Sequence, residues 1–394
     1  MNKNKFTLSL ITSSKEQGGA NIAAQRIKLN LKKKFNVQSI YCDEKNFFKS
    51  IKYFFARFLV KIFIKEENYL NSLNLFSRVN INKLKGDLLI LNWIGEETIS
   101  IDDLIKIQKP IIWIIHDMWA LTSTEHFLND SIKKEYKEKD CSKNLLKKII
   151  FQKKKKFFNK KNIILITNSK WLRNFARKSE LTKKSIIHTV YNPIETNLWK
   201  RKNRKFAKNK LNFDIKKKYI LIGANGGLKN FRKGLDLFFE SLKYINTLNK
   251  KFEVIVLGNN VDKTDTINGF KINFRKFTPN KIEQVLYHSV ADLTVSPSRG
   301  ESIPQFIVET LLCNNPVVSF NIGGMNEILK HKFNGYLASP FNEKDLAKGV
   351  NYVVKNIKHQ NISIYKKKVL KIFNEKNNLK QYSKIINNYS LNHK

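Results

Sequence analysis

Acidic residues are scarce in this chain of 394 residues, which has 32 Asp and Glu against 74 Lys and Arg. The formal charge of +42 favours an anionic partner, either a nucleic acid or a membrane surface, because the summed field of many cations attracts phosphate groups. A general compositional bias is the competing interpretation, since Lys, Asn and Ile are abundant along the whole sequence. Charge alone leaves these alternatives open.

Cysteine and long apolar runs are also lacking. Cys42, Cys141 and Cys313 are too scattered for a disulfide framework or a paired-cysteine metal site, so we expect a reducing cytosol. No run approaches the length that spans a bilayer, so we expect a soluble or peripheral protein. The apolar stretch 6–12 is shorter than the core of a signal peptide, and we interpret it as a first strand.

Hydrophobic residues make up 42% of the chain, which is ample material for a core, and the length favours two domains. Short apolar runs alternate with helical patterns, as in parallel sheets with crossover helices. The sequence therefore predicts an α/β fold with two doubly wound domains. The predicted strands fall into two sets, 6–11, 37–41, 87–93, 110–116, 162–169 and 186–193, then 218–224, 252–258, 270–274, 291–298 and 315–320.

Between these sets the polar segment 200–210, KRKNRKFAKNK, has no apolar periodicity and predicts a linker or exposed connection. We therefore expect an N-terminal domain over 1–200, a second domain over 201–361, and one or two closing helices over 362–394.

Two basic segments have helical patterns. In 51–65 the apolar residues form one stripe while the cations take other faces, which predicts an amphipathic helix. Such a helix can lie in a membrane interface or can pack on its own domain, and both interpretations stay open. We interpret the lysine-rich run 147–161 as a solvated helix face. The stripe consists of Ile51, Phe54, Phe55, Phe58, Leu59, Ile62 and Phe63.

Ligands of open parallel sheets bind beyond the carboxyl ends of the strands, so the loops there are the candidate sites. Gly18 and Gly19 follow the first predicted strand, where they let a ligand approach the backbone or simply form a tight turn. His116 stands at the end of the fourth, beside Asp117 and before His126. At that position a histidine can hydrogen-bond a substrate hydroxyl, although a structural role is equally open.

In the second half, a glycine-rich loop with Gly223, Gly226 and Gly227 leads to the adjacent cations Arg232 and Lys233 at the start of a predicted helix. Such a loop suits a diphosphate, and an ordinary surface pair of cations is the alternative.

The stretch ESIPQFIVE places Glu301 before Pro304 and Glu309 after it. Proline suits the first position of a helix, so we expect Glu301 in a loop and Glu309 on the second helical turn. A carboxylate on such a helix can accept both hydroxyls of a ribose, and the loop carboxylate can reach a second sugar.

Glu301 and Glu309, followed by PVVSFNIGGMNEIL and FNGYLASP, resemble the donor-site signature of retaining glycosyltransferases of family 4. GGANIAAQRI, HDMWALTS, NSKWLRNFARKS, YNPIETNLW and FRKGLDLFFESL are similar to its branch that builds bacterial surface polysaccharides such as colanic acid. The resemblance extends over residues 5 to 355 and implies the GT-B architecture, two Rossmann-like domains that face each other across a cleft.

This resemblance also implies roles for individual residues. Glu309 would bind the ribose of the nucleotide, and Glu301 would bind hydroxyls of the transferred sugar. Arg232 and Lys233 would neutralise the departing diphosphate without a metal, and His116 would touch the donor sugar near the reacting carbon.

Further contacts follow from the same resemblance. The loop with Gly18 and Gly19 would face the acceptor and the phosphates, while Gly223 and the backbone around Ser302 and Ile303 would contact the donor. No cofactor is expected besides the nucleotide-sugar, which is a substrate.

The implied function is a metal-independent transfer of a sugar to a lipid-linked or polysaccharide acceptor, at the cytoplasmic face of a bacterial plasma membrane. The positive charge and the 51–65 helix would hold the enzyme against anionic lipid, and no nucleic acid is expected as a partner. Two alternatives remain, a basic nucleic-acid-binding protein and a sugar-nucleotide epimerase with the GT-B fold.

The chain departs from the family pattern at two places. Ala224 stands where an arginine usually follows the glycine of the first strand in the second domain, so Arg232 is the expected replacement. Ser123 and Thr124 stand where relatives with HDMW often have two glycines.

Overall fold

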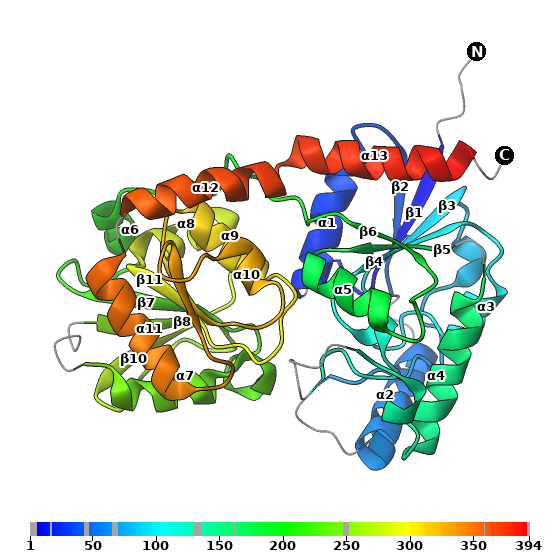
Figure 1. Cartoon of the computed structure of the whole chain (residues 1–394), viewed down its shortest axis with the longest axis horizontal. Helices are drawn as coiled ribbons and strands as arrows, with labels where there is room; N and C mark the ends of the chain where they lie inside the picture. Colours follow the sequence, from blue (N-terminus) through cyan, green and yellow to red (C-terminus); the bar gives the residue numbers. More distant parts are fainter. Residues whose placement is uncertain are drawn as a thin grey trace. The chain divides into compact units, whose positions relative to one another are not determined.

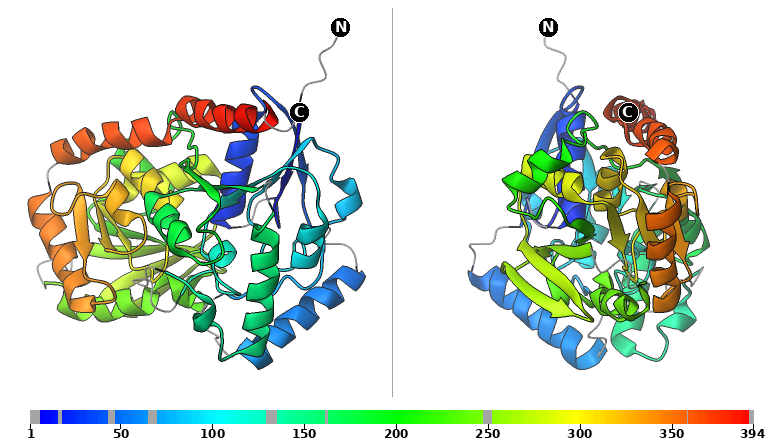
Figure 2. Two further views of the ribbon diagram at one scale, coloured as in Figure 1. Left: turned by 45° about the vertical axis from the view of Figure 1, so that its right-hand side comes forward. Right: turned by 90° about the vertical axis from the view of Figure 1, so that its left-hand side faces the viewer.

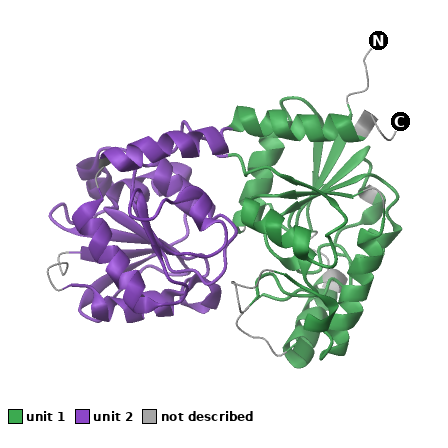
Figure 3. Cartoon of the chain, in the orientation of Figure 1, with its two compact units in different colours: residues 1–193, 375–394 green, residues 194–374 purple. Residues whose placement is uncertain are grey.

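A computed structural model of the chain describes residues 6–15, 18–42, 47–64, 70–128, 135–160, 163–246, 252–357 and 359–391. The chain forms two compact units, residues 1–193 together with 375–394, and residues 194–374 (Figures 1 and 3). Across the described ranges, no helix is both long and apolar enough to cross a membrane.

Unit 1 is built on a six-stranded sheet in the order β2-β1-β3-β4-β5-β6, in which every pairing is parallel. Its central strands are buried along their whole length, because helices cover both faces (Figure 2). The strands are β1 (Thr7–Ile11), β2 (Asn36–Ile40), β3 (Leu88–Leu91), β4 (Ile111–Ile115), β5 (Ile163–Thr167) and β6 (Ile186–Thr189). The helices are α1 (Gly19–Leu31), α2 (Phe47–Leu59) with the π-helix η1 (Val60–Ile64), α3 (Ile101–Lys106), α4 (Leu145–Phe158), α5 (Lys170–Lys178) and α13 (Glu375–Leu391).

Unit 2 contains a seven-stranded sheet in the order β13-β12-β11-β7-β8-β10-β9, parallel except for β9. Its strands are β7 (Lys218–Gly223), β8 (Phe252–Asn259), β9 (Lys263–Ile267), β10 (Phe270–Lys276), β11 (Leu293–Ser296), β12 (Val317–Phe320) and β13 (Gly335–Ala338). Its helices are α6 (Arg204–Lys210), α7 (Leu235–Ser241), α8 (Lys281–Val290), α9 (Gln305–Leu312), α10 (Met325–Ile328), α11 (Glu343–Asn356) and α12 (His359–Phe373).

Each of the eleven strands predicted from the sequence is present, and both sheets are predominantly parallel, as expected. Two strands, β9 and β13, were not predicted. β9 is polar and mostly exposed because it forms the antiparallel edge of its sheet, and a two-residue turn joins it to β10. That turn, Asn268–Gly269, has a positive φ at both residues, which matches the twist of a hairpin.

The predicted linker over 200–210 is wrong, because residues 204–210 form helix α6 of unit 2. Ala207 is fully buried in a cluster with Phe213 and Tyr219, and the buried Lys208 side chain donates to the carbonyl oxygen of Ile215 at 3.0 Å. The chain passes from unit 1 to unit 2 at residues 193 and 194. The tail over 362–394 is divided, since α12 belongs to unit 2 and α13 to unit 1.

Candidate functional site

Three charged residues meet in unit 2 at the carboxyl end of its sheet. Arg232 and Lys233 lie in a short 3-10 turn between β7 and α7, and Glu301 lies in the loop between β11 and α9. One carboxylate oxygen, Oε1 of Glu301, accepts hydrogen bonds from Arg232 Nη1 and Lys233 Nζ, each at 2.7 Å. Arg232 Nη1 also donates to the carbonyl oxygen of Gly300 at 2.8 Å. The structure therefore brings Glu301 together with two cations that precede it by 69 and 68 positions in the sequence, and all three are predicted site residues.

The charges in this cluster act on one another through a largely desolvated space, since each of the three side chains is at most 24% exposed. Burial alone would raise the pKa of Glu301, but Arg232 and Lys233 outweigh it and hold the pKa at about 2. Burial lowers the pKa of Lys233, an effect that Glu301 opposes and Arg232 reinforces. The carboxylate thus neutralises part of a site that otherwise concentrates positive charge.

Arg299 fixes the turn that carries the two cations. Its backbone N–H donates to the carbonyl oxygen of Arg232 at 2.8 Å, and its guanidinium donates to that of Phe231 at 2.9 Å. The guanidinium also lies over the Phe231 ring, 3.8 Å from the centroid, and pairs with Asp236 at 2.7 Å. The sequence analysis missed Arg299, because nothing in the spacing of SPSRGES indicated its partner 63 residues earlier.

Two glycines permit close backbone contacts around this cluster. A Cβ on Gly234, where φ is +65°, would lie 2.0 Å from the carbonyl oxygen of Pro297. A Cβ on Gly323, where φ is +55°, would lie 1.7 Å from that of Glu301. The adjacent Gly324 donates its N–H to the carbonyl oxygen of Ser302 at 2.7 Å. The two glycine-containing loops therefore hold the backbone of residues 297–302 in place.

The other predicted donor residues of unit 2 lie on the same segment or beside it. Ser302 and Ile303 are buried in the loop before α9, and Glu309 is buried on the second turn of that helix, as expected. Gly223 ends β7, where a Cβ would lie 2.6 Å from the ring of Phe306. Packing against Phe306 is sufficient to explain this glycine.

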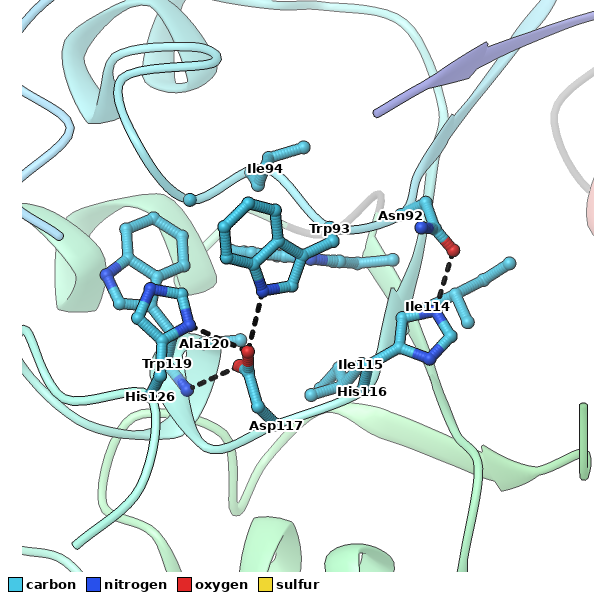
Figure 4. Close-up of a pocket in the computed structure, with 12 residues that line it drawn as sticks. Asn92, Trp93, Ile94, Ile114, Ile115, His116, Asp117, Trp119, Ala120 and His126 are labelled. Atoms are coloured by element: carbon cyan, nitrogen blue, oxygen red, sulfur yellow. Dashed lines mark hydrogen bonds and ion pairs between the residues drawn. The ribbon is translucent and has the colours of Figure 1, made fainter. Parts of the chain in front are cut away.

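In unit 1, His116 follows β4 and pairs with Asn92, which follows β3. Figure 4 shows the contact, 2.7 Å from His116 Nε2 to Asn92 Oδ1. The amide nitrogen of Asn92 donates to the carbonyl oxygen of Ala20 at 3.0 Å, so the amide oxygen faces the ring. His116 Nε2 therefore carries the proton, and Nδ1 is left as an acceptor. Asn92 was also missed, although a polar residue directly after the buried run LLIL was a usable signal.

Burial lowers the pKa of His116 to about 4, and the opposing effect of the Asp117 charge does not compensate for it. The imidazole is thus neutral at pH 7, and a neutral ring can accept a hydrogen bond from a hydroxyl group.

Asp117 and His126 belong to a structural network in the pocket of Figure 4, which lies at the ends of β3 and β4. Asp117 accepts from the indole N–H of Trp93 at 2.7 Å, from the backbone N–H of Trp119 at 3.0 Å and from His126 Nδ1 at 2.7 Å. The opposite ring nitrogen of His126 contacts Ser72 Oγ at 2.9 Å. Asp117 thereby fixes the loop after β4, immediately beyond His116.

Ser123 and Thr124 are buried around a carboxylate. Ser123 Oγ and the backbone N–H of Thr124 donate to Glu125 Oε2 at 3.1 and 3.0 Å, and Lys147 of α4 pairs with Glu125 Oε1 at 2.9 Å. Burial would raise the pKa of Glu125, but Lys147 and the backbone N–H of Thr124 outweigh it and lower the pKa. Ser123 and Thr124 therefore have structural roles in the loop.

Gly18 and Gly19 lie at the start of α1, beyond the end of β1. Gly18 is the residue before the helix and has φ +82°, and a Cβ on either glycine would meet no described atom within 4 Å. Asn21, one turn later, bonds the side chain of Thr12 at the end of β1. The backbone at Gly18 and Gly19 is accessible, as a ligand-facing loop requires, and the predicted role of these glycines stays a prediction.

Residues 203–369 match the family model described as Glycosyl transferases group 1. Two uncharacterized glycosyltransferases of Methanocaldococcus jannaschii are each 26% identical to this chain, over 178 and 205 residues. These alignments cover 39% and 48% of this chain, and 48% and 50% of the two relatives. The chain thus spans about half the length of the curated relatives it matches.

Solved structures match over nearly the whole chain. Anabaena Alr3699/HepE in complex with UDP and glucose superposes with a TM-score of 0.64 at 16% identity, covering 97% of this chain and 100% of that one. Sucrose-phosphate synthase from Thermosynechococcus elongatus gives 0.71 at 12% identity, covering 97% and 98%. The chain has the GT-B fold, and its similarities to known proteins support a glycosyltransferase.

Proposed function

We propose that the chain is a retaining glycosyltransferase of family 4 that moves a sugar from a nucleotide-sugar donor to a lipid-linked or polysaccharide acceptor in bacterial surface-glycan synthesis. The observation that carries this proposal is the cluster of Arg232, Lys233 and Glu301, which lies within the segment similar to group 1 glycosyl transferases. The ligands named for the solved relative, UDP and glucose, support a donor of this chemical class.

The reaction breaks the bond between a sugar carbon and a diphosphate oxygen, so negative charge grows on the leaving diphosphate. Two partly buried cations held in a fixed turn stabilise that charge more strongly than mobile surface lysines, because they are already oriented and largely desolvated. We propose that Arg232 and Lys233 do this work without a metal ion. Arg232 also supplies the second cation that Ala224 does not provide.

Glu301 is suited to a second task in the same cluster. Its Oε1 is committed to the two cations, whereas no hydrogen bond to its Oε2 is present among the described residues. We propose that Oε2 accepts a hydroxyl of the transferred sugar. The two cations would then hold the carboxylate in place and also bind the diphosphate. This arrangement couples the position of the sugar to that of its leaving group.

The remaining roles follow the resemblance. Glu309 would bind the ribose, and Ser302 and Ile303 would contact the donor through their backbone. In unit 1, the acceptor nitrogen Nδ1 of the neutral His116 would receive a sugar hydroxyl, and Gly18–Gly19 would face the acceptor and phosphates. Retention is explained by attack from the face that the diphosphate leaves, with the diphosphate taking the acceptor proton.

A panel of UDP-, GDP- and ADP-sugars tests the proposal first, because the correct donor should raise the unfolding temperature of the chain. With that donor, Lys233→Ala should lower turnover by about 2–4 kcal/mol of transition-state stabilisation, roughly 30- to 1,000-fold. Lys243→Ala is the matched control, since Lys243 is exposed and pairs with the exposed Glu240 on the preceding turn. The anomeric configuration of the product, read by NMR, tests retention.

Glu309→Ala should weaken binding of the nucleotide-sugar while leaving the fold intact. Wild-type turnover in Lys233→Ala, together with unchanged donor binding in Glu309→Ala, would contradict the assignment of this site.

A further inference from the structure

Helix α2 and the π-helix η1 that continues it carry a row of large apolar side chains outward from unit 1. Six of these side chains are between 43% and 69% exposed, an unusual number for eighteen consecutive residues of a folded unit. They are Ile51, Phe54, Phe55, Phe58, Ile62 and Phe63.

The same helix packs on unit 1 through a different and smaller stripe. Ala56, Val60 and Ile64, four residues apart, are buried, and Leu59 packs against the core beside them. The exposed aromatic side chains therefore contribute little to this attachment, although Phe55 contacts Phe76 of unit 1 with the ring centroids 6.2 Å apart. The helix thus packs on its own domain, as one of the two interpretations held, through this smaller stripe and Leu59, while the other six residues of the predicted stripe stay exposed.

The start of α4 extends this apolar surface. Asn144, immediately before α4, donates its side-chain amide to the carbonyl oxygen of Phe63 at 2.7 Å, so the two elements meet there. Helix α4 contacts η1, and Figure 1 shows α2 and α4 at the same edge of unit 1. Leu145 and Ile149 on the first turns of α4 are 74% and 42% exposed. We call these two residues and the six above the aromatic face.

Cations lie beside the aromatic face. The helical segment 47–64 contains four cations and no Asp or Glu, and 143–161 contains no acidic residue either. Lys52, Lys61 and Lys148 are exposed beside the apolar side chains. The cations of the first segment are Lys49, Lys52, Arg57 and Lys61.

This combination selects one kind of occupant. A second copy of the chain would bring the same lysines against themselves across a symmetric interface, which like charges disfavour. An acyl-chain surface accepts the phenylalanines without a complementary shape, and anionic headgroups accept the lysines around them. Charge complementarity therefore favours an anionic lipid bilayer.

We propose that the aromatic face docks unit 1 on the surface of an anionic membrane, with the Phe and Ile side chains among the acyl chains and the lysines on the headgroups. Membrane docking rests on the proposed function, because an enzyme with a lipid-linked acceptor needs such a surface. Membrane binding itself can be measured without any sugar transfer, so the two proposals can fail separately.

Co-sedimentation of the full chain with vesicles tests the proposal. We expect binding to phosphatidylglycerol–phosphatidylcholine vesicles and much weaker binding to pure phosphatidylcholine. Phe54→Ser/Phe58→Ser should weaken binding to the anionic vesicles by roughly tenfold or more. Each substitution removes apolar surface that would be buried in the bilayer, about half of a phenylalanine side chain. Ile282→Ser/Ile364→Ser is the matched control, because both isoleucines are more than 50% exposed on unit 2 and should not affect binding.

The charge contribution has its own variant. Lys52→Gln/Lys61→Gln should weaken binding to the anionic vesicles by roughly 30-fold, about fivefold for each lysine near the surface, and added salt should act in the same direction. Transfer to a water-soluble acceptor should stay at the wild-type rate in both double variants, since neither touches the cation cluster.

Three results would overturn the proposal. They are equal binding by Phe54→Ser/Phe58→Ser and wild type, equal binding to anionic and neutral vesicles, and a change from dimer to monomer in the serine variant with no change in vesicle binding. The last result would assign the aromatic face to a second copy of the chain.

Discussion

Replacing Glu301 by glutamine tests whether its charge holds the two cations of the candidate site together. In the folded chain the pKa of Glu301 is depressed from 4.5 to about 2, because Arg232 and Lys233 outweigh the effect of burial. One pKa unit corresponds to about 1.4 kcal/mol, so the charged form is stabilised by about 3 kcal/mol relative to the unfolded chain. We therefore expect Glu301→Gln to reduce the stability of unit 2 by about 3 kcal/mol at pH 7.

The pH dependence gives the sharper test. Because the folded pKa lies below the unfolded one, the stabilisation is complete above about pH 4.5 and disappears as the pH falls through about 2. The glutamine side chain has no such titration. The difference in stability between wild type and variant should therefore narrow to roughly half, about 1.5 kcal/mol, at pH 3.

Methionine oxidation in a urea series can follow each unit separately. Met325 is buried in unit 2 close to the Gly323 loop, and Met118 is buried in unit 1, so the urea midpoints for their oxidation by peroxide report the two units. The substitution should shift the Met325 midpoint and leave that of Met118 unchanged. Glu240→Gln, which breaks an exposed pair, should cost less than about 1 kcal/mol. A Met325 midpoint that Glu301→Gln does not move, or a difference that persists unchanged at pH 3, would refute the reasoning.

Three further outcomes follow from the structure. Gly323→Ala should reduce the stability of unit 2 by roughly 3 kcal/mol in the same oxidation assay, because the new Cβ collides with a backbone oxygen at a positive φ. Gly269→Ala is the control: its Cβ meets no atom within 4 Å, and it should reduce stability by about 1 kcal/mol. Lys147→Met should reduce the stability of unit 1, read from the Met118 midpoint, by roughly 3–5 kcal/mol, because Glu125 stays buried without its cation. Lys153→Met, which breaks an exposed pair, should reduce it by less than about 1 kcal/mol. EDTA should leave sugar transfer unchanged, and a loss of turnover restored only by Mn²⁺ would contradict the proposed use of two cations for the leaving group.

The sequence was sufficient for the eleven predicted strands, because buried parallel strands are continuous apolar runs such as IIWII and ILIT. β9 was missed because an exposed edge strand, KTDTI, has no such run, although the Asn-Gly pair after it was a hairpin signal. Residues 204–210 were taken for a linker because the helix there packs through Ala207 and the stem of Lys208, which hydrophobic periodicity does not detect.

The site was only partly predictable for a related reason. Arg232, Lys233 and Glu301 could be named from the loops in which they occur, but their shared oxygen, Oε1 of Glu301, depends on the folded path of two loops. Arg299 acts through a partner that is distant in sequence, so no local pattern shows it, whereas the position of Asn92 directly after a buried apolar run was a usable signal. The direction of the α2 phenylalanines could not be decided either, since an amphipathic pattern has two sides and the sequence does not say which one faces the protein.

The division of the tail between the two units has a consequence for biosynthesis. α13 closes one face of the first sheet with Tyr382, Ile386 and Tyr389, and Asn378 donates to the carbonyl oxygen of Tyr191. Unit 2 is therefore an insertion within unit 1, whose core cannot be finished until the last helix leaves the ribosome. During translation the second unit can complete its fold before the first, and a nascent chain that stops short of residue 375 exposes an unsealed sheet to chaperones and proteases.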